Sequence, residues 1–228
     1  MKKQLTIISV AAALLAASCN PSDAKSARPM TSESWLSHAN ASYLAWRDGD
    51  VVRALDEGHK SIEISPRNRA ALYNLGSIEE ALGSCSDALM LYESILKLQP
   101  GDLDSALGSA RCQIRSGQTE QGMALLKELG AKQGKSFDWY YKVGDTYLQA
   151  DDAAAAAAST EKALRLAANP DQKERAQSQL YFALLRSGEL KRAGQLKTSV
   201  LHSKQPKNEE FYVLTAQLES TPEQAQDL

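Results

Sequence analysis

The chain has 228 residues, of which 43% are hydrophobic and 24% are charged, and its formal net charge is −2. This composition is typical of a folded globular protein and excludes a largely disordered chain. The nearly balanced charge gives no bias toward polyanions, which argues against nucleic acid as a partner.

The first 18 residues have the layout of a secretory signal peptide. Lys2 and Lys3 precede an uncharged apolar run from Leu5 to Ala17, and small residues follow it. A run of this length is shorter than the ~20 residues of a membrane-spanning helix. We therefore expect residues 1–18 to be a signal peptide that is removed from the mature chain.

The end of this segment, LAASC at residues 15–19, resembles the lipobox of bacterial lipoproteins. The resemblance implies that Cys19 is lipidated and becomes the mature N-terminus. Ala16 stands where leucine is commonest, so ordinary cleavage after Ser18 is the alternative. Asn20 is not the aspartate associated with inner-membrane retention in enteric lipoproteins, which favours an anchor in the outer membrane over one in the inner membrane.

A polar stretch without helical periodicity follows Cys19 and extends to Ser34. Such a stretch is typical of a flexible spacer. We therefore interpret residues 19–34 as a lipidated N-terminus and tether, with the folded body beginning at about residue 35.

From residue 35 the chain alternates amphipathic helical patterns with short turns at a fixed period. The turn positions Gly49, Gly83, Gly117 and Asp151 are each 34 residues apart. Two columns of small residues have the same spacing, namely Ala54, Ala88, Gly122 and Ala156, and further upstream Ser42, Gly76, Ala110 and Gly144. Small residues are needed where two helices cross closely. The columns therefore predict repeated pairs of packed helices.

This pattern resembles the tetratricopeptide repeat, a helix-turn-helix unit of about 34 residues. The resemblance implies an all-α, right-handed superhelical solenoid of about five repeats, at residues 35–68, 69–102, 103–136, 137–170 and 174–206. The third repeat is degenerate, and the fifth is expected about three residues late because of extra residues after Pro170. Asn169 and Pro170 nevertheless suit a helix start. Residues 207–228 are expected to form a capping helix, from Asn208 to about Glu219, and a tail.

No catalytic constellation is visible in the sequence. His38, His59 and His202 fall in different parts of the solenoid, which suggests neither a metal triad nor a Ser-His-Asp group. Residues 134–136 resemble the end of a P-loop, but Leu129 stands where that motif needs glycine. We therefore expect no enzyme activity, no catalytic residues, no metal and no cofactor.

Cys85 and Cys112 are expected in facing helices of the second and third repeats. In an oxidising compartment they could form a disulfide that closes a loop of about 27 residues and contributes ~3 kcal/mol. Alternatively, both are small core residues, because Cys112 stands in a column where these repeats favour alanine. The Cα separation that decides between the two is not readable from sequence.

The resemblance also implies a concave groove, lined by the first helix of each repeat, that holds an extended peptide or a partner's helix. Its candidate residues are Tyr43, Arg47, Tyr73, Ser77, Arg111, Arg115, Tyr141, Asp145, Gln149, Phe182 and Arg186. Tyrosine and arginine are favoured at binding centres, whereas the alternative is solvated arginines and half-buried packing tyrosines. We expect an acidic or C-terminal segment to bind where Arg111, Arg115 and Tyr141 come together, and these positions to make few contacts between repeats.

Some members of the family clamp a C-terminal carboxylate with lysines and asparagines from three repeats. Asn74 and Arg111 match two of those places. Ala39, Tyr43 and Leu107 occupy the other three, so we do not expect this chaperone-type activity.

A signal peptide with a lipobox followed by five or six repeats resembles pilus-assembly lipoproteins of Gram-negative bacteria, namely the type IV pilus pilotin and the tight-adherence pilus lipoprotein. The resemblance implies a non-enzymatic periplasmic scaffold for an envelope machine, such as a pilus or secretion system. Its partners would be other envelope proteins, and only its N-terminal lipid would contact the membrane. The alternatives are a scaffold for cell-wall or polysaccharide-export machinery and a soluble, unlipidated chaperone for secreted substrates.

Overall fold

The computed structural model describes residues 34–131, 136–205, 207 and 209–219. The expected signal peptide, Cys19, nearly all of the tether and the C-terminal tail lie outside these residues. Every regular element in the described part of the chain is an α-helix, as the sequence predicted. The chain divides into two compact units, Met1–Leu125 and Leu126–Leu228.

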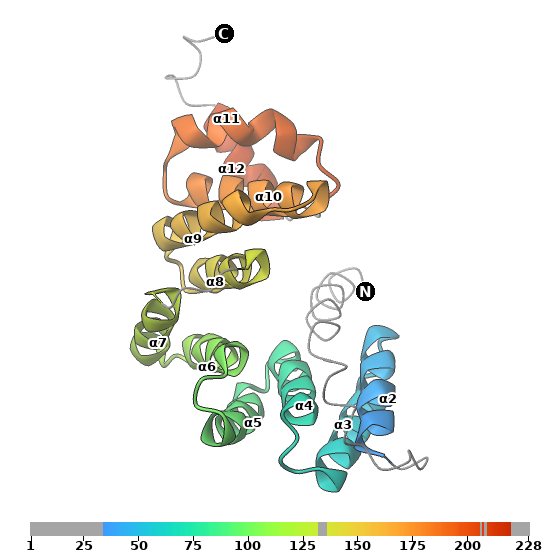
Figure 1. Ribbon diagram of the computed structural model, residues 1–228. Helices are drawn as coiled ribbons and strands as arrows, with labels where there is room; N and C mark the ends of the chain where they lie inside the picture. The colour runs from blue at the N-terminus through green and yellow to red at the C-terminus, as the bar shows by residue number, and fades with distance from the viewer. Residues whose placement is uncertain (1–33, 132–135, 206, 208, 220–228) are drawn as a thin grey trace. The chain divides into compact units, whose positions relative to one another are not determined.

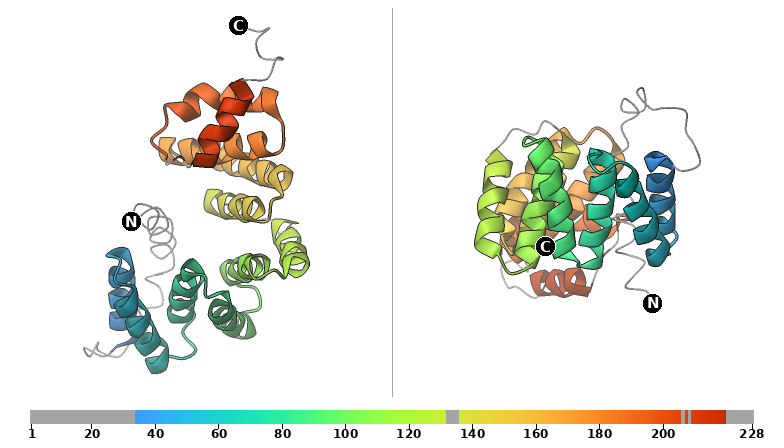
Figure 2. Two further views of the ribbon diagram at one scale, coloured as in Figure 1. Left: turned by 180° about the vertical axis from the view of Figure 1, so that it is seen from behind. Right: turned by 90° about the horizontal axis from the view of Figure 1, so that it is seen from below.

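The described helices form five consecutive pairs and a final single helix (Figure 1). The pairs are α2 (Trp35–Arg47) with α3 (Val51–Ile64), α4 (Arg69–Leu82) with α5 (Cys85–Leu98), α6 (Leu103–Arg115) with α7 (Thr119–Ala131), α8 (Phe137–Gln149) with α9 (Ala153–Leu166), and α10 (Pro170–Arg186) with α11 (Leu190–Leu201); α12 (Glu209–Glu219) follows. In the first unit the first helices α2, α4 and α6 contact one another in that order (Figures 1 and 2). In the second unit α8 contacts α10, and α10 contacts α12.

The first helix of each repeat begins at a polar residue that caps it. The side chains of Ser34, Asn68, Asp102, Ser136 and Asn169 accept hydrogen bonds from the backbone N–H three residues further on, at 3.2, 3.1, 2.8, 3.2 and 2.9 Å. Such a cap typically contributes ~1 kcal/mol to helix stability. The caps therefore fix the start of each first helix with nearly the period of the repeat.

The predicted turn column is confirmed by the backbone. Gly49, Gly83 and Gly117 have φ values of 82°, 89° and 83°, and Asp151 has φ 63°. This left-handed region favours glycine and admits aspartate. Gly188, with φ 76°, occupies the same place in the fifth repeat and extends the column.

The small-residue columns lie where the helices of a pair cross. Ala54, Ala88 and Ala156 are completely buried, as is Ala110 in the upstream column. Position 122 is glycine, whereas the other members of its column are alanine, because a Cβ there would lie 2.7 Å from the carbonyl oxygen of Ala110. The third repeat is therefore degenerate in sequence because its two helices approach more closely than a methyl group allows.

The first helix of the fifth repeat is extended at its N-terminal end. Its first helix α10 begins at Pro170 and has 17 residues, whereas α8 has 13. Asn169 caps this helix, so the residues after Pro170 lengthen it by about a turn rather than delaying its start.

Candidate protein-binding surface

Arg111 does not stand free as a cation for a partner. Its guanidinium on α6 donates two hydrogen bonds to the carboxylate of Glu80 on α4, at 2.5 and 2.9 Å. The hydroxyl of Tyr92 on α5 donates to the same carboxylate at 2.8 Å. Because the bonds to Glu80 join the second and third repeats, the expectation of few contacts between repeats is wrong at Arg111.

The electrostatics of this cluster favour a permanent ion pair. Burial raises the pKa of Glu80, but the charge and hydrogen bonds of Arg111 outweigh burial and leave the pKa below its usual value. Burial lowers the pKa of Arg111, but Glu80 raises it well above its usual value. Burial, and then Glu80, raise the pKa of Tyr92. The two opposite charges therefore compensate each other inside the first unit.

Arg115 and Arg186 join successive first helices in a second way. Arg115 donates to the backbone carbonyl of Glu80 at 2.8 Å, and Arg186 donates to that of Leu148 at 3.1 Å. Both carbonyls lie near the C-terminal end of the preceding first helix, where the helix dipole favours a cation. Arg186 also binds the carboxylate of Asp151 at 2.5 Å. Both candidate groove arginines thus have a structural role.

The remaining groove candidates of the first unit divide between packing and surface. Tyr73 is buried, with its ring centroid 5.8 Å from that of Tyr92. Tyr43 and Ser77 are half-buried. Arg47 is exposed and pairs with the neighbouring Asp48 at 3.0 Å. Of these four candidates, Arg47 presents the most accessible polar group.

The candidates of the second unit centre on Tyr141. Its ring stacks on Phe137, with centroids 5.6 Å apart and planes at 18°. The guanidinium of Arg175 on α10 lies 4.6 Å from the centroid of Tyr141. Arg175 was not among the groove candidates, although the helix start predicted at Asn169 and Pro170 places it in the second turn of α10.

The other second-unit candidates have local contacts. Gln149 is exposed and donates to Asp145 at 2.8 Å along α8. Phe182 is half-buried, and the guanidinium of Arg186 lies 5.6 Å from its ring centroid. Arg111 and Arg115 belong to the first unit, where both bind Glu80. Tyr141 belongs to the second unit, where its ring contacts Phe137 and Arg175.

Cys85 and Cys112 are free, buried thiols in one hydrophobic cluster with Tyr92. Burial, followed by Glu80 and then by the neighbouring thiol of Cys85, raises the pKa of Cys112. This arrangement agrees with the core interpretation, and the expected alternative disulfide is not formed in this structure.

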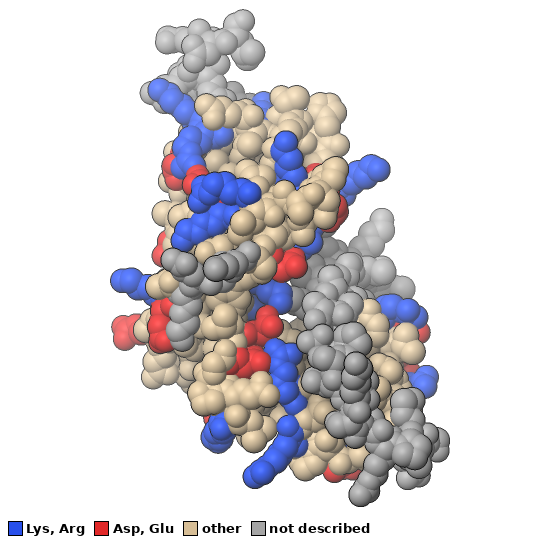
Figure 3. Space-filling view, in the orientation of Figure 1, with Lys and Arg blue, Asp and Glu red and all other residues tan. Residues whose placement is uncertain are grey.

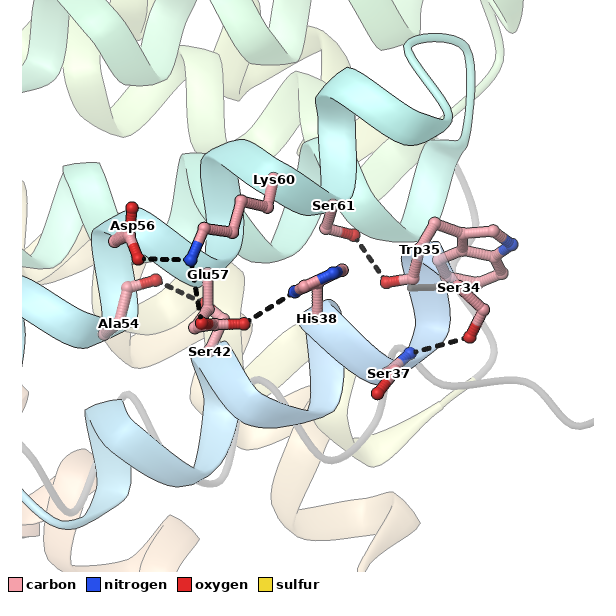
Figure 4. A network of polar contacts seen from close by, with 10 residues as sticks. All are labelled: Ser34, Trp35, Ser37, His38, Ser42, Ala54, Asp56, Glu57, Lys60 and Ser61. Carbon is pink, nitrogen blue, oxygen red and sulfur yellow. Dashed lines mark hydrogen bonds and ion pairs between the residues drawn. The ribbon is translucent and has the colours of Figure 1, made fainter. Parts of the chain in front are cut away.

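His38, which the sequence placed in no catalytic group, lies in a network that joins α2 to α3 (Figure 4). Its Nδ1 contacts the carboxylate of Glu57 at 2.7 Å, and Lys60 binds Asp56 at 2.7 Å and Glu57 at 3.2 Å. The hydrogen bond with His38, and then Lys60, lower the pKa of Glu57 against the effect of burial. The network ties the first pair of helices together.

The described residues contain neither a metal-binding cluster nor a membrane-spanning helix. No group of three or more histidine, cysteine, aspartate or glutamate side chains in this part of the chain could hold a metal ion. None of the described helices combines the length and the apolar character needed to cross a bilayer.

Comparisons with known proteins agree with the repeat architecture. Residues 81–143 match the family described as "Tetratricopeptide repeat". The sequence has no significant match among curated proteins. Among solved structures, Pseudomonas aeruginosa PilF has a TM-score of 0.64 at 17% identity, covering 84% of this chain and 86% of its own.

Two other solved structures are similar to the same extent. TTC0263, a thermophilic TPR protein of Thermus thermophilus, has a TM-score of 0.62 at 20% identity and covers 82% of this chain and 100% of its own. PilW, described as a type IV pilus biogenesis factor, has a TM-score of 0.62 at 15% identity. The match covers 80% of this chain and 83% of PilW. Helix pairs, turn column and family match together define the class: the chain has the tetratricopeptide-repeat fold, which typically binds protein partners.

Proposed function

We propose that the chain is a non-enzymatic, lipid-anchored scaffold that faces the periplasm and helps to assemble an envelope machine such as a pilus. The observation that carries this proposal is the tetratricopeptide-repeat fold, since stacked first helices provide a surface for a protein partner. The fold likeness to PilF and PilW supports a role in pilus assembly. The signal-peptide layout and the lipobox resemblance support an anchored, periplasmic location.

The partner is proposed to contact the first helices through their less constrained side chains. Tyr141 and Phe182 are half-buried on α8 and α10, and each has a guanidinium against its ring. Aromatic residues of this kind combine contact area with low conformational freedom, as interface centres require. An extended segment with carboxylates would complement Arg175, whose guanidinium lies against the ring of Tyr141.

The binding proposal is tested by pull-down from envelope extract. Tyr141→Ala and Phe182→Ala are compared with Val52→Ala, an exposed residue on a second helix, after each variant is shown to melt like the wild type. We expect the two first-helix variants to lose about fivefold or more of the captured partner, as central interface residues often do. If both recover partners as well as Val52→Ala does, the first-helix surface is not the binding site.

The anchor is tested separately by the intact mass of the mature protein. Lipidation at Cys19 predicts an N-terminus beginning at that residue with added acyl chains, and Cys19→Ser should release the protein or leave the signal uncleaved. An unmodified mature N-terminus in the wild type would exclude the anchor and favour a soluble periplasmic protein.

A further inference from the structure

The second helices of the second unit, α9 and α11, carry an excess of positive charge. Together they contain Lys162, Arg165, Lys191, Arg192 and Lys197 but a single carboxylate, Glu161. We call Lys162, Arg165, Lys191 and Arg192 the basic face; Lys197 is half-buried and is not part of it. Figure 3 shows lysine and arginine side chains gathered over α9 and α11, with few acidic side chains among them.

Three of these four cations have no carboxylate partner among the described residues, the exception being Arg192. Glu161 and the capping residue Glu189 both bind the same cation, Arg192. Lys162 lies 5.4 Å from the ring centroid of Tyr140, a contact that leaves its charge in place. Arg165 and Lys191 are exposed, and the structure gives neither of them a carboxylate partner within the described residues.

The excess is specific to the second unit and is not a property of the repeat. The corresponding second helices of the first unit, α3 and α5, contain three cations and five carboxylates, namely Arg53, Lys60 and Lys97 against Asp56, Glu57, Glu63, Asp87 and Glu93. Charges of either sign keep an exposed helix face in water, so solvation does not explain an excess of cations. The contrast between equivalent helices therefore points to a ligand that is negatively charged.

We infer that the basic face docks on the surface of a bilayer that contains anionic phospholipid. Lysines on long, mobile side chains suit a diffuse negative surface, to which each cation contributes about 1 kcal/mol. An acidic peptide would instead favour arginines fixed in bidentate geometry, and Arg192 already binds two carboxylates. The inference rests on the proposed membrane anchor. The sequence predicted that only the N-terminal lipid contacts the membrane, and the basic face would add a second membrane contact.

The test uses the purified full chain with vesicles of neutral phosphatidylcholine, or with about one third anionic phosphatidylglycerol added. Acetylation rates of Lys162 and Lys191 are measured by mass spectrometry, and Lys97, exposed on α5, is the internal control. We expect the anionic vesicles to slow acetylation at Lys162 and Lys191 about threefold or more and to leave Lys97 unchanged. About 0.5 M salt should abolish the protection by screening.

Matched variants assign the effect to the basic face. Lys162→Glu should largely remove the protection of Lys191 from acetylation on anionic vesicles, whereas Lys97→Glu should not change it. Equal acetylation on neutral and anionic vesicles would overturn the inference. So would protection that requires an acidic envelope protein instead of anionic lipid. Flotation with neutral vesicles reports the lipid anchor alone, so failure of the anchor is distinguishable from failure of the basic face.

Discussion

Arg111 and Glu80, 31 residues apart in sequence, form a bidentate ion pair across two repeats, with hydrogen bonds of 2.5 and 2.9 Å. Only 8% of each residue is exposed. A buried pair of this kind stabilises a fold only while both partners are present, because either charge left alone is poorly solvated. Arg111, which the sequence predicted as a partner-binding residue, therefore stabilises the first unit.

Arg111→Ala should lower the free energy of unfolding by about 3–5 kcal/mol, because it leaves the Glu80 carboxylate buried without its partner. The matched control is Arg47→Ala, whose side chain is 53% exposed and pairs with its neighbour Asp48. That change should alter the free energy by less than ~0.5 kcal/mol. Urea denaturation checks both variants, and equal stability of the two would contradict a structural role for Arg111.

Acid should destabilise the first unit through Glu80. Its pKa is lower in the folded chain than its usual value of 4.5, so the unfolded chain binds protons more readily. The stabilisation is therefore complete above pH 4.5 and is lost as the pH falls through the lower folded-state pKa. Glu80→Gln should be less stable at neutral pH but should lose less stability on acidification. A variant whose urea midpoint falls with pH as steeply as that of the wild type would rule out Glu80 as the responsible group.

Gly108 and Gly101 provide a matched pair for helix packing. A Cβ at Gly108 would lie 2.5 Å from the ring of Tyr92, which is completely buried and cannot move aside easily. Gly108→Ala should therefore lower the free energy of unfolding by about 1–3 kcal/mol. At Gly101 a Cβ would meet nothing within 4 Å, so Gly101→Ala should leave the melting temperature nearly unchanged. Similar melting temperatures for the two variants would show that Tyr92 relaxes.

Gly76 and Gly144, in the upstream column of small residues, provide a related test of helix packing. A Cβ would lie 3.0 Å from Tyr92 at Gly76 and 2.6 Å from the Thr160 hydroxyl at Gly144. Gly76→Leu and Gly144→Leu should each lower the free energy of unfolding by roughly 1–3 kcal/mol through overpacking. Neutral effects at both sites, measured by thermal unfolding, would contradict the assignment of this column to helix crossings.

The thiols of Cys85 and Cys112 should be inert while the protein is folded. Both are buried, and the raised pKa of Cys112 keeps it protonated, whereas thiol reagents attack the thiolate. Under reducing conditions, peptide mapping should find alkylation at both positions only after denaturant is added. Rapid alkylation of the native chain at either position would show that the cluster opens locally.

The sequence by itself determined the helix pairs, because the signals that define them are local. A left-handed turn at Gly83 depends on one residue's steric freedom, and the Asn169 cap depends on a side chain reaching three residues along the chain. The buried small residues also repeat at a fixed spacing, so the period was readable without knowledge of any contact. In the fifth repeat the turn at Gly188 comes three residues later than the 34-residue period from Asp151 requires, and the Asn169 cap places the extra residues inside the first helix.

Only the tertiary structure decided which polar side chains bind one another and which remain for a partner. Arg111, Arg115 and Arg47 all lie on first helices and are alike in sequence, yet the first binds Glu80, the second binds that residue's carbonyl and the third is exposed. Their difference depends on the distance between neighbouring helices, which is set by the packing of residues such as Tyr92 and Gly108. Helical periodicity gives the face on which a side chain lies, but the partner across that face depends on packing between segments that are distant in sequence.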